Sequence, residues 1–405
     1  MRVLILGGGF GGAYAARTLE RLLAERDDVQ VSLVNRDNYL VFQPLLAEVV
    51  SGDLGVHDTV TPLRRLVPRT QLFVRQVTSV DLEARTVTLA PSFRPREVVL
   101  EWDRLILGLG SVPALSARPG FAEHALAFRT LADAVRLRNH LIRVLEQAAI
   151  EDDPRARATL LTVVVAGGGF SGTELAAAIN DFMREALSAF RSRISRQELR
   201  VVLVHASEHV LDREVSPRLA KYATRALART GVELQLGVRA DEATPECVVL
   251  TDGRTIGTRT FITTVPSAPS PVVTSLELPL EQGRLKVDST LQVEGRDDVW
   301  AIGDSAAVPS PDGKGLCPTT AQYAVREADV AAENVLASID GTPRRTFAFT
   351  GLGKLGALGR RRAVAELPGG VRLAGLPAWL AWRAVYWSKL PGLDRKLKVG
   401  ASWLM

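Results

Sequence analysis

Residues 3–12 read VLILGGGFGG, and residues 163–172 read VVVAGGGFSG. Each stretch is an apolar run followed by three glycines, a phenylalanine and, two residues later, a further glycine. A short apolar run bounded by glycines favours a buried strand, and the apolar residues behind each glycine cluster have helical spacing. The sequence therefore predicts two strand–turn–helix units, 160 residues apart along the chain.

Both turns have the spacing G-x-G-x-x-G. The first glycine makes the turn, the second lets the backbone approach a pyrophosphate, and the third lets helix and strand pack closely. The pyrophosphate lies at the helix N-terminus, where unpaired N–H groups and the helix dipole favour an anion. One such motif is as often a plain glycine-rich turn, whereas two in this context predict two dinucleotide sites, for one bound cofactor and one exchanging cosubstrate. The candidate residues are Gly7, Gly8, Gly9, Phe10, Gly11 and Gly12 at the first turn, and Gly167, Gly169 and Gly172 at the second.

A third element follows the second unit. Residues 298–304, DVWAIGD, predict a strand that ends at Gly303 and Asp304. A carboxylate there can accept hydrogen bonds from a sugar-alcohol chain such as the ribityl of a flavin; the alternative is an ordinary acid in a strand-ending turn. In the flavin interpretation, residues near both ends of the chain build one domain and the second unit is inserted in it.

The predicted fold class is α/β, with two Rossmann-type dinucleotide-binding domains and a C-terminal amphipathic segment. The predicted parts are a flavin domain over 1–115 and 266–345, a connecting helix and linker over 116–158, a nicotinamide domain over 159–265, and a membrane-association segment over 346–405. Residues 130–133, TLAD, form a capping box that opens a helix to about residue 149. The charged stretch 151–157 is a predicted linker, and the strand-rich stretches 72–89 and 247–264 are predicted hairpins.

The composition is that of a globular protein, with 46% hydrophobic and 23% charged residues among 405. No run of eighteen apolar residues occurs, so no transmembrane helix is expected. The two cysteines, Cys247 and Cys317, are too few and too far apart for a disulfide framework or a thiolate metal site. We therefore expect a cytoplasmic chain in which Cys317 is a small buried thiol.

Positive charge is concentrated at the C-terminal end. Residues 343–405 hold twelve lysines and arginines against two acids, so the remainder of this +5 chain carries about −5. This distribution argues against nucleic-acid binding and favours a local anionic partner for the tail.

The tail also carries an aromatic arc. Its members are Trp379, Trp382, Tyr386 and Trp387, with Arg383 among them. Aromatic rings flanked by cations suit a helix in a membrane interface, with Arg383 reaching the headgroups, so we expect contact with a membrane surface through residues 376–398. The alternative is a dimer core or a docked helix.

In these motifs the chain resembles the two-dinucleotide-binding flavoproteins and, within them, the type II NADH:quinone oxidoreductases, which are single-subunit enzymes that do not pump protons. The glycine turns are shared widely, whereas FQPLL at 42–46 and AQ at 321–322 discriminate this family. The resemblance implies hydride transfer from NADH or NADPH to FAD, and then transfer of two electrons to a quinone or another small electron acceptor. It also implies a homodimer bound peripherally to the inner face of the cell membrane.

The resemblance further assigns site residues. Around FAD, beyond the first glycine turn, it places Asn35, Arg36, Pro44, Val77, Gly110, Gly303, Asp304, Ala321 and Gln322. NADH or NADPH would lie on the second turn, with Glu174 and His205. No metal is predicted, since His205 and His209 are the only closely spaced histidines and lack carboxylate support.

The chain departs from the family pattern at several positions. Asn35 and His205 stand where an acid usually holds the adenosine ribose. An amide oxygen can still accept a ribose hydroxyl, and without an acid at 205–207 the 2′-phosphate of NADPH is not strongly excluded. Pro266-Ser267 replaces an Ala-Gly pair beside the nicotinamide, and Arg326 stands where many relatives have a second glutamine.

Glu174, Gln322 and Arg326 are the catalytic candidates. Glu174 falls in the first turn of the second helix, where the dipole alone stabilises an acid by about 0.3–1 kcal/mol; its functional role would be to orient the nicotinamide or relay a proton. Gln322 and Arg326 share a helix face. Arg326 either pairs with a nearby acid or stabilises the developing quinol anion.

Two other functions fit parts of the sequence. One is a soluble NAD(P)H-dependent flavoprotein reductase with a non-quinone acceptor, which the short tail and Pro266-Ser267 leave open. The other is a non-catalytic flavin-holding protein whose inner nucleotide site no longer turns over. Only His205 supports the latter, and both complete glycine patterns oppose it.

Overall fold

The computed structural model describes residues 1–403 apart from 94, 191–192 and 265–266. The chain divides into two compact units: residues 1–41, 60–112 and 268–351 form the first, and residues 42–59, 113–267 and 352–405 form the second. The predicted division placed residues 42–59 in the flavin domain. They cluster instead with the second unit because their helix α2 (Leu46–Ser51) packs on α5 (Leu131–Ile150) and α7 (Phe170–Ala186).

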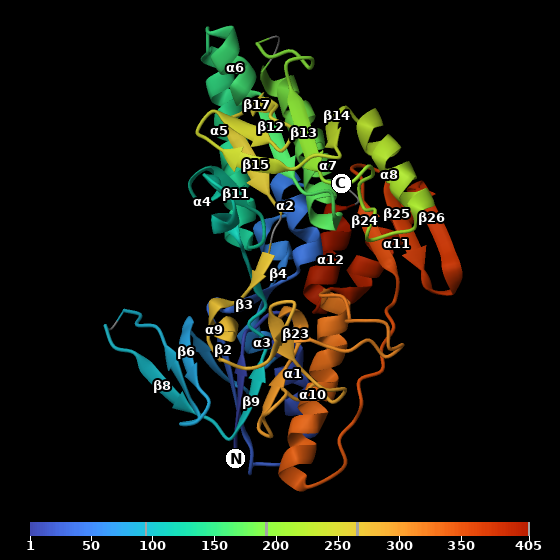
Figure 1. Ribbon diagram of the computed structural model, residues 1–405. Helices are drawn as coiled ribbons and strands as arrows, with labels where there is room; N and C mark the ends of the chain where they lie inside the picture. The colour runs from blue at the N-terminus through green and yellow to red at the C-terminus, as the bar shows by residue number, and fades with distance from the viewer. Residues whose placement is uncertain (94, 191–192, 265–266, 404–405) are drawn as a thin grey trace. The chain divides into compact units, whose positions relative to one another are not determined.

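The first unit is built on a parallel sheet with the strand order β22-β9-β1-β2-β5 (Figure 1). Its strands are β1 (Arg2–Leu6), β2 (Gln30–Asn35), β5 (Gln71–Val74), β9 (Arg104–Leu107) and β22 (Val299–Ala301). The β1 side chains from Val3 to Leu6 are buried, as expected for a parallel sheet covered on both faces. Leu6 pairs with Leu107, which pairs with Ala301, so the first glycine turn lies at the same sheet edge as the ends of β9 and β22.

Helices and smaller sheets complete this unit. Helix α1 (Phe10–Leu22) packs on α10 (Ala321–Asp340). The hairpin predicted over 72–89 is confirmed for its second half, where β6 and β7 are antiparallel; its first half is strand β5 of the main sheet, since Leu72 pairs in parallel with Leu33. The remaining elements are β3 (Tyr39–Val41), β4 (Val60–Pro62), α3 (Leu63–Leu66), β6 (Val77–Asp81), β7 (Thr86–Leu89), β8 (Val98–Glu101), α9 (Pro271–Thr274), β20 (Leu280–Glu281), β21 (Arg284–Lys286), η5 (Gly303–Ser305) and β23 (Ala306–Ala307).

The second unit repeats this plan with a parallel sheet of strand order β11-β18-β12-β13-β14. Its strands are β11 (Ala125–Ala127), β12 (Thr162–Ala166), β13 (Arg200–His205), β14 (Val232–Leu236) and β18 (Thr260–Thr263). All of β12 is buried, as its apolar run predicted. The capping box is confirmed: Thr130 Oγ1 accepts from Asp133 N, and α5 begins at the next residue, Leu131.

Two sequence expectations for this unit need correction. The stretch 151–157 is a helix over most of its length, α6 (Pro154–Leu160), because Asp153 caps it and Pro154 occupies its first position. The stretch 247–264 is a hairpin only in its first half, since β18 joins the main parallel sheet. The hairpin strands are β16 (Cys247–Leu250) and β17 (Thr255–Gly257), and β15 (Ala240–Ala243) pairs with β16.

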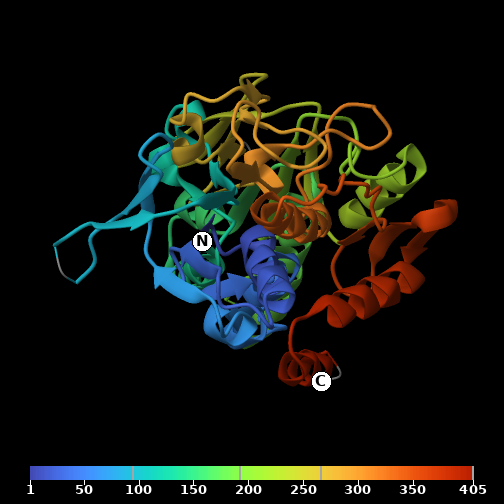
Figure 2. The same cartoon turned by 90° about the horizontal axis from the view of Figure 1, so that it is seen from below.

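The C-terminal residues of this unit form a small sheet and two helices, drawn in red in Figure 2. The sheet consists of β24 (Lys354–Ala357), β25 (Ala363–Leu367) and β26 (Val371–Gly375), and the helices are α11 (Leu376–Lys389) and α12 (Leu393–Ser402). Within the described residues, no helix combines the length and the apolar character needed to cross a bilayer. Other elements are η1 (Gln43–Leu45), η2 (Val56–Asp58), β10 (Ser111–Pro113), η3 (Leu115–Ala117), α4 (Phe121–His124), η4 (Leu187–Phe190), α8 (Pro217–Arg229), β19 (Ser267–Pro269) and η6 (Pro368–Gly370).

Candidate functional site

The first glycine turn has the shape that a dinucleotide requires. Gly7 has φ +100°, and a Cβ there would lie 2.2 Å from the oxygen of Gly108. A Cβ at Gly12 would lie 1.8 Å from the oxygen of Gly7, so the helix passes the strand closely. At Gly9, by contrast, no described atom lies within 4 Å of the Cβ position. The turn therefore leaves open space over its middle glycine, where the motif places a pyrophosphate.

Asn35 holds this turn in place. Its Oδ1 accepts a hydrogen bond from Gly8 N at 2.8 Å, and its Nδ2 donates to the oxygen of Asp37 at 2.8 Å. The side chain predicted to meet the adenosine ribose is thus also a clamp on the glycine turn. The neighbouring Arg36 is exposed and pairs with Asp37 at 3.7 Å.

Asp304 lies at the end of β22, in a network that the strand pattern did not predict. Its Oδ2 accepts from Ser111 Oγ at 2.7 Å, and Ser305 Oγ accepts from Gly110 N at 2.9 Å. Glu327 of α10 accepts from Gly303 N at 2.6 Å, and burial raises the pKa of Glu327 to about 7. These contacts fix Gly110, Gly303 and Asp304 at the edge that carries the first glycine turn.

The remaining residues assigned to the flavin lie on several elements. Ala321 and Gln322 begin α10, and Val77 is buried at the start of β6. Pro44 lies in η1, within the second unit.

Arg326 pairs with a nearby acid, Asp329, which is one of the two roles considered for it from the sequence. It lies one turn after Gln322 on α10, so the two share a face as predicted. Its guanidinium lies 3.9 Å from Asp329 Oδ2 and 5.8 Å from the ring centre of Phe349. Because the side chain is about half exposed, this ion pair contributes little to stability. A role toward a quinone stays a prediction.

The second glycine turn repeats the first. Gly167 has φ +116°, and a Cβ at Gly172 would lie 1.9 Å from the oxygen of Gly167. Here His205 is the clamp: its Nδ1 accepts from Gly168 N at 3.1 Å, and its Nε2 lies 3.2 Å from Asp212 Oδ1. An imidazole that accepts at Nδ1 and donates at Nε2 is neutral, so both contacts are satisfied together.

Two acids near this turn were missed by the sequence interpretation. Residues 205–207 contain no acid, but Asp212 reaches the ring of His205. Burial alone would raise the pKa of Asp212, but hydrogen bonds from Ser207 and His205 outweigh it and lower that pKa. Glu214 Oε1 lies 2.8 Å from the Cβ position of Gly169, and burial raises its pKa. The strand pattern ends at His205, so it contained no signal for acids supplied by the following loop.

Glu174 lies in α7 with hydrogen-bond partners from the C-terminal segment, and its predicted position needs correction. It lies in the second turn of α7, because the helix begins at Phe170. Its Oε1 accepts from Ala357 N at 2.9 Å and from Trp382 Nε1 at 3.2 Å. Burial, opposed by these two hydrogen bonds, raises the pKa of Glu174 to about 8.

A second buried carboxyl lies close enough to interact with Glu174 electrostatically. Glu48 of α2 accepts from Trp403 Nε1 at 2.8 Å, and burial raises the pKa of Glu48 to about 7. Desolvation raises the pKa of the half-buried Tyr386, and nearby Glu174 raises it further. We call Glu48, Glu174, Trp382, Tyr386 and Trp403 the buried acid cluster. Nothing in the sequence brought α2, α7, α11 and α12 together, so only Glu174 was predicted as a site residue.

The aromatic arc of the tail is therefore divided between core and surface. Trp382 is buried and meets Tyr386 edge-on, with ring centres 4.9 Å apart. Arg383 was expected to reach lipid headgroups, but its guanidinium lies 3.9 Å from the ring centre of Trp379 and donates to the oxygen of Trp403 at 2.9 Å. The inward face of α11 therefore packs against the protein, as the docked-helix alternative predicted.

Cys317 has the environment of a structural thiol. Cys317 is buried, its Sγ lies 3.6 Å from the oxygen of Pro309, and burial raises its pKa to about 11, as expected for an inert thiol. Among the described residues, no group of three or more His, Cys, Asp or Glu side chains could hold a metal ion. Pro266, which replaces the alanine of the usual Ala-Gly pair beside the nicotinamide, lies outside the described residues.

Comparison with known proteins extends along the whole chain. Residues 1–328 match the family described as pyridine nucleotide-disulphide oxidoreductase. The chain is 32% identical to a demethylphylloquinone reductase of Synechocystis, over 100% of this chain and 95% of that protein. It is 29% identical to a type II NADH:quinone oxidoreductase of Mycobacterium tuberculosis, over 99% of this chain and 87% of that protein. The structure of NDH2 from Plasmodium falciparum in complex with NADH has a TM-score of 0.91 at 17% identity, covering 100% of this chain and 97% of the other.

Proposed function

This chain belongs to the type II NADH:quinone oxidoreductases, within the pyridine nucleotide-disulphide oxidoreductase family, and from that premise we propose how its own residues carry the reaction. It is an oxidoreductase that passes a hydride from a pyridine nucleotide to a flavin, and then two electrons to a quinone. The observation that carries the assignment of roles is the pair of glycine turns, each clamped by a side chain from the neighbouring strand.

The first turn is the FAD site. The open space over Gly9 and the fixed edge formed by Gly110 and Asp304 fit a dinucleotide whose sugar-alcohol chain runs toward the carboxylate. FAD bound there supplies the two-electron carrier between the nicotinamide and the quinone. The backbone N–H groups at the start of α1 hold the pyrophosphate, because they have no partner within the helix.

The second turn is the NAD(P)H site. Here Asp212, held by the neutral ring of His205, is the acid nearest the position that recognises the adenosine ribose. A carboxylate there repels the 2′-phosphate of NADPH, so we expect a preference for NADH of no more than about a hundredfold, or less than about 3 kcal/mol. Replacement of Asp212 by Asn should bring the kcat/KM values for the two nucleotides to within about tenfold. An unchanged ratio would remove Asp212 from this role.

The buried acid cluster supplies the proton. Reduction of a quinone to a quinol by NAD(P)H consumes one proton in addition to the hydride. With pKa values raised to about 8 and 7, Glu174 is mostly protonated and Glu48 is about half protonated at neutral pH, whereas an exposed glutamate is almost fully ionised there. We assign Glu174 the role of proton donor and Glu48 that of its replenishing partner.

The outward side of the last two helices is a membrane surface. We name Leu376, Leu380, Trp387, Leu393 and Leu397 the leucine face. All five side chains are more than two-fifths exposed, and Lys389 and Lys398, which are also exposed, lie on the same two helices. Large apolar side chains bordered by lysines fit an interface with anionic lipid. We place the protein peripherally on the inner face of the cell membrane, as a homodimer.

Vesicle binding tests the membrane surface. Leu393→Gln with Leu397→Gln should weaken co-sedimentation with phosphatidylglycerol vesicles and slow turnover with a long-chain quinone, while activity with a short soluble quinone is retained. The matched control is Ile142→Gln with Ile150→Gln, which changes two exposed apolar residues of α5. Equal sedimentation of both variants would contradict the proposal, and sedimentation velocity reports whether the protein is a dimer.

A spectroscopic titration tests the reaction itself. The purified protein should show a flavin spectrum that NADH bleaches and that a quinone restores. Bleaching that no quinone reverses, but that a soluble one-electron acceptor does, would favour the soluble reductase. Absence of bleaching would favour the flavin-holding protein.

A further inference from the structure

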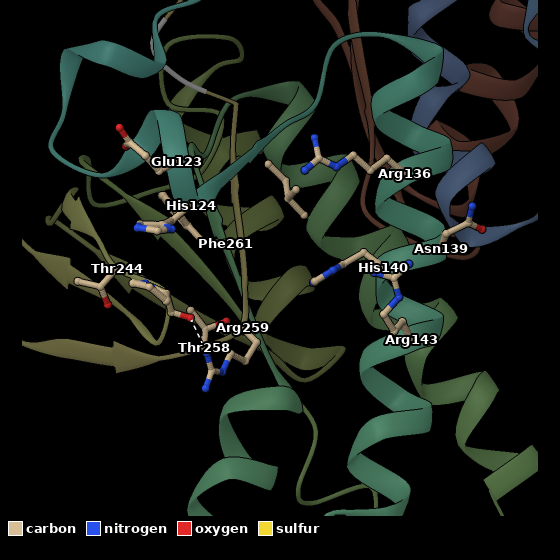
Figure 3. A pocket seen from close by; sticks show the side chains of 12 residues that line it. Glu123, His124, Arg136, Asn139, His140, Arg143, Thr244, Thr258, Arg259 and Phe261 are labelled. Carbon is tan, nitrogen blue, oxygen red and sulfur yellow. Dashed lines mark hydrogen bonds between the residues drawn. The ribbon is translucent and has the colours of Figure 1, made fainter.

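A cavity of about 530 Å³ lies in the second unit, apart from the features described so far (Figure 3). One wall is helix α5. The other walls are α4, the start of β18 and the connection from β15 to β16. Its volume is within the range typical of small-molecule sites.

Cations dominate the wall formed by α5. Arg136, Asn139, His140 and Arg143 follow the spacing i, i+3, i+4, i+7 and therefore share one face of the helix. Within the described part of the chain, Arg136 and Arg143 have no ion pair or hydrogen bond. Both guanidinium groups are thus available to a ligand, and Figure 3 shows them on the helix that borders the cavity.

The opposite walls add further cationic groups. Arg259 lines the cavity and is held by Glu246 at 3.0 Å and by the oxygen of Pro245 at 3.2 Å. His124 lies across from α5. Among the described residues that line the cavity, Glu123 is the only carboxylate. Because Arg259 is already paired with Glu246, the charges that face a ligand are Arg136 and Arg143 against Glu123, which leaves a net positive charge and favours an anionic ligand.

The pKa of His140 is affected by the positive charges of the cavity wall. Its Nε2 lies 2.8 Å from Thr260 Oγ1. Burial lowers the pKa of His140, and the positive charges of Arg143 and Arg136 lower it further. The lowered pKa favours a neutral His140 ring, which can form hydrogen bonds but adds no charge to the cavity. The positive charge that a ligand meets therefore comes from the arginines.

The cavity lies at the sheet edge opposite the second glycine turn. In the parallel register Val163 pairs with Thr260 and Ala166 with Thr263, so β18 starts at the edge where β12 starts. The glycine turn follows Ala166, at the other end of β12. Ala125 pairs with Phe261, which places the end of α4 at the starting edge as well. A ligand of the cavity therefore does not occupy the pyrophosphate position.

We propose that this cavity is a binding site for a small elongated organic bisphosphate. Arg136 and Arg143 are two helical turns apart, a rise of about 10 Å, so they can pair with anionic groups at the two ends of one molecule. Guanidinium groups bind phosphate oxygens in pairs, which gives the arginines an advantage over lysines here. Phe261 and Pro245 also line the cavity and add apolar side chains to its wall. The site does not depend on the assignment of the quinone reaction.

Calorimetric titration of the flavin-loaded protein tests this site. The two probes are fructose 1,6-bisphosphate and fructose 6-phosphate, which differ by one phosphate. The bisphosphate should bind at least tenfold more tightly, and saturating NAD⁺ should leave its affinity unchanged. Equal affinity for the two probes, absence of binding at millimolar concentration, or displacement by NAD⁺ would each overturn the proposal.

Paired variants assign the binding to the cavity. Arg136→Gln with Arg143→Gln should weaken bisphosphate binding at least tenfold. The matched control is Arg225→Gln with Arg229→Gln, which removes the same charge from exposed positions of α8 and should change the affinity less than twofold. Flavin content and circular dichroism verify that both proteins are folded. Equal weakening in the two variants would show only a general charge effect and would overturn the proposal.

Discussion

The two glycine turns share a backbone but differ in the side chains around it. Gly7 and Gly167 both have positive φ. A Cβ at Gly12 or at Gly172 would lie less than 2 Å from the backbone oxygen of Gly7 or Gly167, respectively. In the first turn the clamp is an amide, Asn35, whereas in the second it is a neutral imidazole, His205, backed by Asp212. The geometry of the turn is thus set by glycine, and the clamp can vary in chemistry provided that it accepts a hydrogen bond from the backbone N–H of Gly8 or Gly168.

The helices that follow the turns differ more. The position of Glu174 in α7 corresponds to that of Tyr14 in α1, counted from the first glycine of each turn. Tyr14 is partly buried beside Arg17 and Asp329, whereas Glu174 is enclosed by α11 and β24. In our proposal the first repeat therefore only binds its dinucleotide, FAD. The second repeat binds NAD(P)H and also carries the proton donor, Glu174. Four predictions test this comparison, in order of decreasing expected effect.

Alanine at the third glycine should have the largest effect. Gly12→Ala and Gly172→Ala each force a Cβ to within 2 Å of a backbone oxygen, so helix and strand must separate, at a cost of several kcal/mol. We expect the first variant to lose its flavin, and the second to keep flavin but lose bleaching by NADH.

Gly9→Ala is the matched variant for this pair. It meets no described atom, so the protein should fold normally and still hold less flavin, since its methyl group occupies the pyrophosphate position. Flavin content by absorbance and circular dichroism separate these outcomes. Full flavin occupancy in Gly9→Ala would place the pyrophosphate elsewhere.

Glu174→Gln should lower quinone turnover about a hundredfold, the typical contribution of a general acid. NADH bleaching and flavin content should be retained, because neither requires the proton. Tyr14→Phe, the corresponding change in the first repeat, should leave turnover within about twofold. Stopped-flow measurement of the two half-reactions distinguishes a proton role from a packing role, since a packing defect would slow both.

Glu48→Gln should make stability less dependent on pH. Burial raises the pKa of Glu48 to about 7, above the ordinary value near 4.5, so the folded protein binds more protons than the unfolded chain between those values. The free energy of unfolding therefore falls as pH rises from about 5 to 7, by up to about 1.4 kcal/mol per pH unit. Apparent melting temperatures at pH 5 and 8 should differ less in the variant than in the wild type. Identical differences would mean that Glu48 is not protonated in the folded state.

His205→Asn, which copies the clamp of the first turn, should have the smallest effect. The amide can accept from Gly168 N, so the KM for NADH should change less than about threefold. Asparagine is shorter than histidine and loses the contact with Asp212, so discrimination against NADPH should weaken modestly. A large increase in the KM for NADH would mean that the two turns are not equivalent in geometry.

The local features of this fold were predictable because each has a short-range cause. The strands before Gly7 and Gly167, the helices after them, and the cap at Thr130 all depend on residues within a few positions of one another. The two proposed dinucleotide sites rest on the same short segments. Gly303 and Asp304 were also placed correctly in a turn directly after a strand, β22, which ends at the sheet edge that carries the first glycine turn. This was predictable because the apolar run and the turn are adjacent in sequence.

The buried acid cluster and the clamps were decided only by tertiary structure. Glu48, Glu174 and Trp382 come from three helices and Trp403 directly follows a fourth, α12; the residues are up to 355 positions apart, and no periodic pattern links them. Their raised pKa values result from burial, which depends on how α2, α7, α11 and α12 pack. Likewise, Asp212 reaches His205 from a loop, and Glu327 reaches Gly303 from another helix. Sequence determines which groups a segment can offer, whereas desolvation and hydrogen bonding between distant segments exist only once the chain has folded.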